Sequence, residues 1–107
     1  MIYLTNAFSL NMLKPGCPAE ISVRPLTVQE VVDFDKAADL VSAVGHPDTA
    51  QVFSAILGFP VEAHRIDVKL GVQGSLIVGQ YSGPRLEEGA TELPAGAKIK
   101  WFLVDVH

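Results

Sequence analysis

Apolar and polar residues alternate over several short stretches of the chain, which is the spacing of half-buried β-strands. Ile66, Val68 and Leu70, for example, are separated by Asp67 and Lys69. Alternating stretches, together with short apolar runs bounded by turn residues, predict strands over residues 2–4, 21–26, 66–70, 76–81 and 99–106. The pattern therefore supplies enough strands for one sheet.

Two further stretches have the signals of helices, and the first begins at a capping pattern. Thr27 and Glu30 have the spacing of a capping box, and the valines between and after them form an apolar side. We therefore expect a helix from Val28 to about Phe34, with residues 35–40 continuing or following it.

The second helix is marked at both ends. Pro47 suits the first helical position, where a missing N–H costs nothing, and Gly58 suits the left-handed conformation that ends many helices. Between them, apolar residues repeat at i, i+1, i+4 and i+5, namely Val52, Phe53, Ile56 and Leu57. We therefore predict a helix that begins next to His46 and ends at Gly58.

At 107 residues the chain is expected to form one domain over residues 1–107. Strands interspersed with two helices predict an α+β fold, a mixed sheet of about five strands with helices packed on one face. Residues 82–96 contain two Pro and three Gly and little apolar pattern. A loop of that length in a compact domain is typically a lid or a binding loop.

Composition narrows the possible partners. Hydrophobic residues make up 49% of the chain and charged residues 19%, which is typical of an ordered globular protein. The net charge is −4 and the eight Lys and Arg residues are scattered, which argues against binding to duplex nucleic acid and leaves a compact anionic ligand possible.

Several absences from the sequence bear on location. The single cysteine, Cys17, cannot form an internal disulfide, and residues 1–6 lack the features of a signal peptide. No apolar run approaches the roughly eighteen residues needed to span a bilayer, so we expect no membrane partner. These features predict a cytoplasmic protein.

His46 is the first candidate catalytic residue. A residue before proline adopts an extended conformation, and the residue that caps the start of a helix needs the same conformation. The imidazole would then stand beside unpaired N–H groups that attract a phosphate. The same helix dipole disfavours imidazolium, so a general acid here needs a negative neighbour, either the bound phosphate or a carboxylate such as Glu88. The alternative is a surface histidine with no role.

The sequence contains no metal-binding motif. The three His and the single Cys lie far apart, and neither a Walker loop nor a Gly-x-Gly-x-x-Gly motif occurs. We therefore expect no metal and no cofactor. If the protein cleaves RNA without a metal ion, the nucleophile is the ribose 2′-hydroxyl of the RNA itself. The products then end in 2′,3′-cyclic phosphates.

Four segments, in their order and spacing, resemble the small viral and prokaryotic ring nucleases. They are Asn6–Asn11 (NAFSLN), Ser42–His46 (SAVGH), His64–Ile66 (HRI) and Arg85–Gly89 (RLEEG). That family degrades cyclic tetra-adenylate, the second messenger of type III CRISPR defence, and its viral members act as anti-CRISPRs. The resemblance runs over nearly the whole chain, and it implies a metal-independent ring nuclease.

The resemblance also implies roles for individual residues. His46, Arg85 and Glu88 match the catalytic positions, with His46 as general acid and Arg85 holding the phosphate. Glu87 stands where the family commonly has proline, so it competes with Glu88 for the role of working carboxylate. The ligand-binding positions that the resemblance implies are Asn6, Ser9, Asn11, Gly45, Arg65, Ile66, Gln80 and Arg85.

Each of these positions also has a plain structural alternative. Arg65 can pair with Asp67 or Glu62, Asn6, Ser9 and Asn11 are turn formers, and Arg85 can simply be solvated. His64 stands where the family usually shows asparagine, and we interpret it as an exposed residue at a strand end.

The resemblance further implies a homodimer that shares one ligand, with the loop at residues 82–96 of each subunit folding over it. Two other functions stay open. One is a protein that binds a cyclic oligonucleotide as a sink or sensor without cutting it, and the other is a structural or regulatory dimer with no nucleotide ligand.

Overall fold

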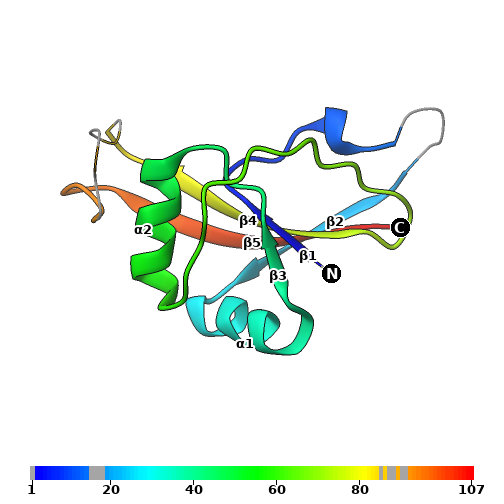
Figure 1. Cartoon of the computed structure of the whole chain (residues 1–107). Coiled ribbons are helices and arrows are strands. Elements are labelled where there is room, and N and C mark those ends of the chain that lie inside the picture. The colour runs from blue at the N-terminus through cyan, green and yellow to red at the C-terminus, as the bar shows by residue number, and fades with distance from the viewer. Residues whose placement is uncertain (1, 15–18, 85, 87–88, 90–91) are drawn as a thin grey trace.

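Five strands of the computed structural model form one mixed sheet (Figure 1). The structure describes residues 2–14, 19–84, 86, 89 and 92–107. Within these residues the strand order is β2-β5-β4-β1-β3. The bounds are Ile2–Thr5 for β1, Ile21–Leu26 for β2, Leu40–Ser42 for β3, Ser75–Ser82 for β4 and Lys98–Val106 for β5.

Three neighbouring strands of this sheet are parallel. β1 pairs with β3 on one side and with β4 on the other, both in parallel register, whereas β5 is antiparallel to β4 and to β2. Leu4 lies opposite Ser42 in β3 and opposite Ile77 in β4. The carboxyl ends of β1, β3 and β4 therefore meet at one edge of the sheet.

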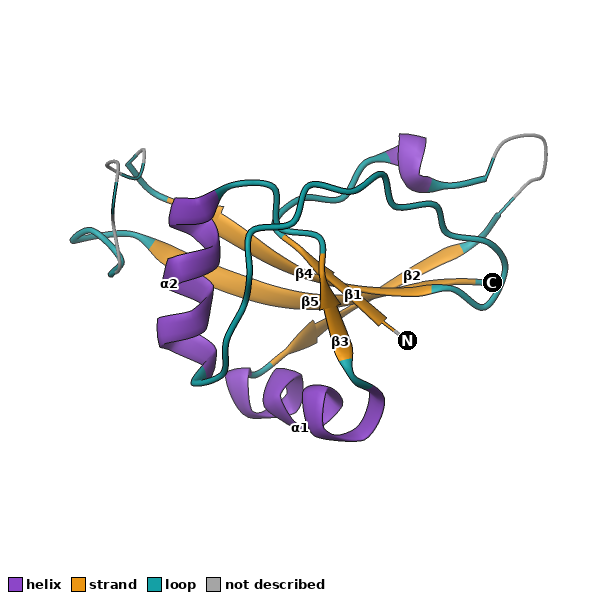
Figure 2. Cartoon of the chain, in the orientation of Figure 1, coloured by secondary structure: helices purple, strands orange, loops and turns teal. Residues whose placement is uncertain are grey.

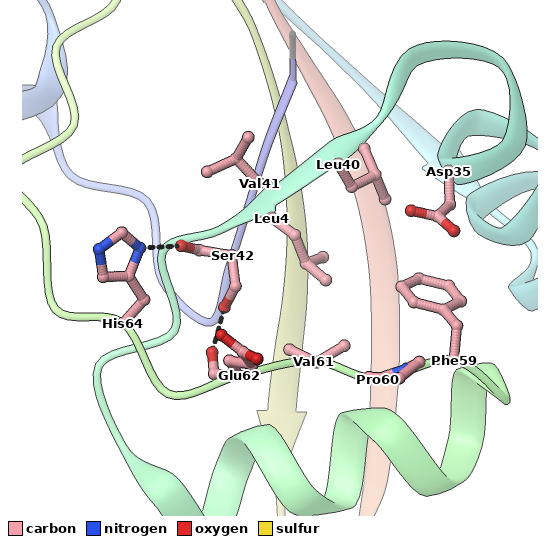
Figure 3. Close-up of a pocket in the computed structure, with 10 residues that line it drawn as sticks. All are labelled: Leu4, Asp35, Leu40, Val41, Ser42, Phe59, Pro60, Val61, Glu62 and His64. Atoms are coloured by element: carbon pink, nitrogen blue, oxygen red, sulfur yellow. Dashed lines mark hydrogen bonds between the residues drawn. The ribbon is translucent and has the colours of Figure 1, made fainter.

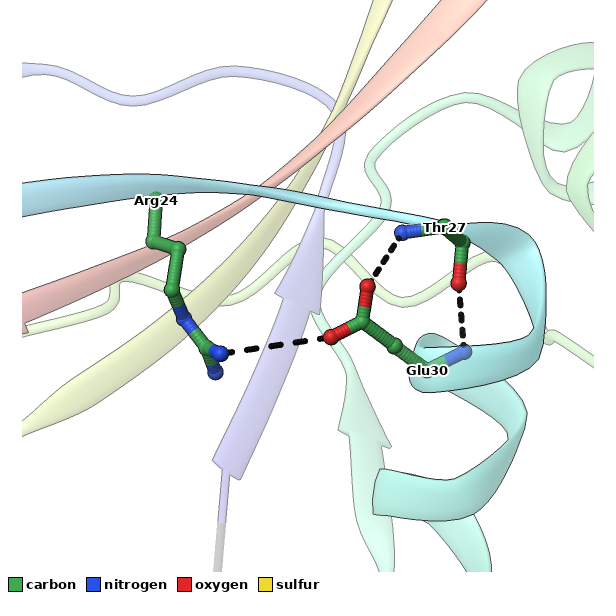
Figure 4. Close-up of polar contacts among 3 residues, drawn as sticks. All are labelled: Arg24, Thr27 and Glu30. Atoms are coloured by element: carbon green, nitrogen blue, oxygen red, sulfur yellow. Dashed lines mark hydrogen bonds and ion pairs between the residues drawn. The ribbon is translucent and has the colours of Figure 1, made fainter.

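Helix α1 runs from Val28 to Ala38 and begins at the predicted capping box (Figure 4). The Thr27 hydroxyl accepts a hydrogen bond from the Glu30 N–H at 3.1 Å, and the Glu30 carboxylate accepts one from the Thr27 N–H at 3.0 Å. A guanidinium nitrogen of Arg24 lies 3.9 Å from the same carboxylate. The prediction of this helix is confirmed, and the helix continues four residues beyond Phe34 to end before Asp39.

Helix α2 runs from Pro47 to Leu57, as predicted, with His46 at its start and Gly58 in the left-handed conformation at its end. The Phe53 ring of α2 stands edge-on to the Trp101 indole of β5, with 4.8 Å between ring centroids. Both rings lie over Gly79 of β4, where a Cβ would come within 2.6 Å of each. Glycine at this position lets the helix approach the sheet closely.

Each face of the sheet is covered by its own cluster of buried side chains. Both helices pack on the face of Ile77, Trp101 and Leu103. The opposite face, with Leu76 and Val104, is covered by two chain segments without α-helix, residues 6–14 and 63–74. These segments lie side by side, since Leu13 pairs with Leu70 (Figure 2). The predicted α+β fold, with its α-helices on one face of a mixed sheet, is confirmed.

The predicted strand at residues 66–70 is wrong, although its alternation is real. Val68 and Leu70 are buried and Asp67 and Lys69 are exposed, but the segment crosses over the face of the sheet instead of joining its edge. Its backbone pairs only at Leu70 within the described residues. The fifth strand is instead β3, whose three residues are too few to show a period.

Candidate functional site

The carboxyl ends of the three parallel strands bring two of the predicted segments, together with Gln80, to one edge of the sheet. Asn6 follows β1, Gly45 and His46 follow β3, and Gln80 lies near the end of β4. The crevice outside the carboxyl ends of parallel strands is a usual place for ligands in open α/β sheets. This edge is therefore the candidate functional site.

His46 caps α2 with its backbone and not with its side chain. Its backbone is extended, with φ −122° and ψ 127°, as expected before proline, and its imidazole forms no capping hydrogen bond. The residue is exposed. The Ala50 N–H is the first to bond within the helix, to the His46 carbonyl at 3.0 Å, and Pro47 has no N–H. Helix geometry therefore leaves the N–H groups of Asp48 and Thr49 for an anionic ligand.

A depression of about 320 Å³ lies beside His46. The described residues that line it are His46, Asp48, Thr49, Tyr81 and Leu86. The first three come from the start of α2, Tyr81 from the end of β4, and Leu86 from the segment that follows. The depression therefore joins the start of the helix to the segment that sequence analysis predicts as a lid or binding loop.

Two hydrogen bonds connect that loop to the site. The Asp48 carboxylate accepts a hydrogen bond from the Gly89 N–H at 2.9 Å, and the Tyr81 hydroxyl donates one to the Pro84 carbonyl. Arg85, Glu87 and Glu88, which carry the predicted phosphate-binding and carboxylate roles, lie outside the described residues.

Sequence reasoning did not assign Asp48, Thr49 or Tyr81 to the site. The available signal was position, since Asp48 stands two residues after His46 in the same first turn. Asp48 thus places a carboxylate in the first turn of α2, at the depression that His46 also lines.

Arg65 and Gly45, two of the predicted ligand-binding residues, lie together. The Arg65 Nε lies 3.6 Å from the point that a Cβ on Gly45 would occupy. Asp67, one of the two carboxylates considered as ion-pair partners of Arg65, lies 3.9 Å from the Lys69 ammonium. The arrangement places an exposed guanidinium beside the residue that precedes His46.

A second depression, of about 340 Å³, lies between α1, the free edge of β3 and residues 59–64 (Figure 3). Polar and apolar groups line it in similar measure, and at one end Ser42 and His64 contact each other. The His64 Nδ1 lies 3.0 Å from the Ser42 carbonyl, and the Ser42 hydroxyl donates to the Glu62 carbonyl at 2.5 Å. His64 is exposed, as expected from the sequence.

The remaining predicted ligand-binding residues are placed less closely together. The Ser9 hydroxyl caps the 3-10 turn at Leu10–Met12 by accepting from the Asn11 N–H at 3.2 Å, and the Asn11 carbonyl accepts from the Lys69 ammonium at 2.7 Å. Neither residue lines the depression beside His46. Ile66 packs against the core cluster on the face opposite the α-helices. Ser9 thus has the local role of a turn former, whereas the Asn11 carbonyl connects the turn to Lys69.

Within the described part of the chain, no group of three or more His, Cys, Asp or Glu side chains is arranged to hold a metal ion. None of the helices described there is long and apolar enough to cross a membrane.

Comparisons with known proteins give the family of the chain. A family model described as STIV B116-like matches residues 2–96. Uncharacterized protein 26 of Sulfolobus islandicus filamentous virus (isolate Iceland/Hveragerdi) is 33% identical over 89 residues, which are 83% of this chain and 74% of that protein. The solved structure of B116 of Sulfolobus turreted icosahedral virus (STIV) superposes with a TM-score of 0.81 at 28% identity and covers 97% of both chains. The chain therefore belongs to the STIV B116-like family.

Proposed function

We propose that this protein is a metal-independent ring nuclease that cleaves cyclic tetra-adenylate to linear products ending in 2′,3′-cyclic phosphates. One observation carries the proposal. The His46 imidazole stands exposed at the start of α2 with no capping bond of its own, beside N–H groups that suit a phosphate and beside a depression at the carboxyl ends of parallel strands. The sequence resemblance to the ring nucleases supports the choice of substrate.

The proposed reaction uses the substrate's own nucleophile. A ribose 2′-oxygen attacks the adjacent phosphorus in line, and its proton passes to Glu88 or to water. The bond from phosphorus to the 5′-oxygen breaks, and protonated His46 gives its proton to that oxygen. The N–H groups of Asp48 and Thr49 and the guanidinium of Arg85 stabilise the charge on the equatorial phosphate oxygens.

A cyclic tetranucleotide has two-fold symmetry, and a homodimer presents the same surface twice. We propose that two copies of the chain share one ring, that each copy cuts one of two opposite phosphodiesters, and that the loop at residues 82–96 closes over the ligand. The two similar proteins come from viruses, which supports a role as an anti-CRISPR in the cytoplasm of an infected cell.

The deciding experiment is incubation of the pure protein with cyclic tetra-adenylate in EDTA, followed by chromatography of the products. Linear products with 2′,3′-cyclic phosphate ends are expected. If the ligand binds in calorimetry but stays intact after long incubation with excess protein, the protein is a sink or sensor and not a nuclease. Absence of binding to any cyclic oligoadenylate would leave a structural or regulatory dimer.

The matched control for this experiment is His107→Ala. His107 is an exposed histidine like His46, but it follows β5, which runs antiparallel to β4, so it lies at the opposite edge of the sheet. Its variant is expected to cleave like the unmodified protein.

A further inference from the structure

Two segments far apart in the sequence, residues 42–44 and 62–64, are joined by three hydrogen bonds, and a fourth bond lies within residues 42–44. Figure 3 draws the bonds of Ser42 with Glu62 and with His64. The Ser42 hydroxyl donates to the Glu62 carbonyl at 2.5 Å and accepts from the Val44 N–H at 3.3 Å. The His64 N–H donates to the Val44 carbonyl at 2.7 Å, and the His64 Nδ1 lies 3.0 Å from the Ser42 carbonyl. We refer to Ser42, Val44, Glu62 and His64 as the clasp.

The protonation of His64 follows from its partner. A carbonyl oxygen only accepts hydrogen bonds, so the Nδ1 atom of His64 carries a proton in this contact. It carries that proton both in the neutral Nδ1–H form and in imidazolium. The clasp is therefore compatible with both charge states of His64.

The clasp precedes two residues of the candidate site in the sequence, His46 and Arg65. Val44 comes two residues before His46, and His64 is bonded to Arg65, whose Nε lies 3.6 Å from the point that a Cβ on Gly45 would occupy. Backbone pairing of the two segments is limited to the bridge between Val44 and Ala63. Three of the four hydrogen bonds of the clasp involve a side-chain atom.

His64 does not stabilise the fold through burial. The residue is exposed and belongs to neither cluster of core side chains. A hydrogen bond at an exposed position contributes little to the stability of a fold. The next residue that packs against the core along this segment is Ile66, so Arg65 stands between the clasp on one side and Ile66 on the other.

We infer that Ser42 and His64 are positioning residues that hold Arg65 against Gly45, next to His46, and thereby set the affinity of the site for its anionic ligand. The identity of that ligand, cyclic tetra-adenylate, rests on the proposed function. The placement of Arg65 by the clasp does not.

A double-mutant cycle tests whether His64 acts through Arg65. His64→Ala is expected to raise KM for cyclic tetra-adenylate roughly tenfold and to change kcat by less than about threefold, because a phosphate contact is made in the ground state. Arg65→Ala is expected to do the same, and the double variant is expected to be no worse than Arg65→Ala. An unchanged KM in His64→Ala, or additive effects in the double variant, overturns the inference.

His64→Asn is the matched control, because its side-chain amide donates to the same carbonyl. It is expected to restore KM to within about threefold of the unmodified protein. The pH dependence of kcat is expected to stay unchanged in both variants, since His64 donates in either charge state. A His64→Asn variant as impaired as His64→Ala would contradict the positioning role.

NMR of the ligand-free protein tests whether the clasp orders the Arg65 side chain. The Arg65 Nε–H is expected to be ordered in the unmodified protein and in His64→Asn, and mobile on the nanosecond timescale in His64→Ala and Ser42→Ala. Equal order in all four proteins overturns the inference. If the unmodified protein neither binds nor cleaves cyclic tetra-adenylate, the proposed function fails, and the NMR comparison still decides whether the clasp positions Arg65.

Discussion

The carboxylate of Asp48, in the first turn of α2, accepts a hydrogen bond from the backbone N–H of Gly89 at 2.9 Å. This contact joins the start of the helix to a loop 41 residues further along the chain. Asp48 also lines the same depression as His46. One carboxylate thus connects the loop to the start of the helix that carries the proposed general acid.

Asp48→Ala tests whether this contact holds the loop at the site, with Asp48→Asn as its control, because the amide oxygen can still accept from the Gly89 N–H. Asp48→Ala is expected to lower the cleavage rate about tenfold and Asp48→Asn by less than about threefold, since a hydrogen bond to a charged group contributes about 1.5–3 kcal/mol. Single-turnover cleavage of cyclic tetra-adenylate measures both rates. Equal rates for the two variants would show that the contact with Gly89 does not matter to the reaction.

Glu88→Gln is the companion experiment, with Glu87→Gln as its control. If Glu88 accepts the 2′-hydroxyl proton, Glu88→Gln is expected to lose activity at every pH, with no recovery in acid. The pH–rate profiles of the two loop variants distinguish the carboxylates. Loss of activity in Glu87→Gln with normal activity in Glu88→Gln would reverse our assignment.

His46→Ala is expected to lower the cleavage rate by roughly 10²–10⁴-fold and to change the dissociation constant of cyclic tetra-adenylate little. The reason is that proton donation to the leaving oxygen occurs only in the transition state. Single-turnover cleavage and calorimetry on the same preparation measure the two quantities. Turnover like that of His107→Ala would exclude His46 as the general acid.

Arg85→Ala is expected to weaken binding as well as cleavage, because a guanidinium that holds a phosphate does so in the ground state too. A rise in the dissociation constant of about tenfold is the expected size for one lost charge-assisted contact. Lys36→Ala, which removes a positive charge from an exposed position in the last turn of α1, is the control for net charge. Equal binding by Arg85→Ala and the unmodified protein argues against the phosphate contact.

Gly79→Ala is expected to destabilise the fold, because the added Cβ would lie 2.6 Å from ring atoms of both Phe53 and Trp101. Overpacking of this kind costs about 1–3 kcal/mol. Urea denaturation followed by Trp101 fluorescence measures the change in the free energy of unfolding. The control is Gly71→Ala, whose Cβ would have the flexible Lys14 side chain as its nearest neighbour, at 3.5 Å. Equal stability of the two variants would mean that the Phe53 and Trp101 rings can move aside at little cost in free energy.

The sequence by itself determined the elements whose signals are local. The capping box at Thr27 and Glu30 sets the start of α1, and Pro47 and Gly58 set the limits of α2. These signals involve residues close together in the chain, so their effect depends little on the rest of the fold. The extended backbone of His46 follows from the same local rule, since proline comes next.

Only the tertiary structure decided which apolar segments entered the sheet and which groups met at its edge. Residues 66–70 alternate like a strand but cover one face, whereas the three residues of β3 join the sheet by pairing with β1. Alternation reports that one side of a segment is buried, and it does not report whether the backbone pairs. The contacts of Asp48 with Gly89 and of Arg65 with Gly45 likewise join residues distant in sequence. The first exists because β3 and β4 run parallel and end at the same edge of the sheet, and the second because residues 62–64 lie beside residues 42–44. No local pattern encodes either contact.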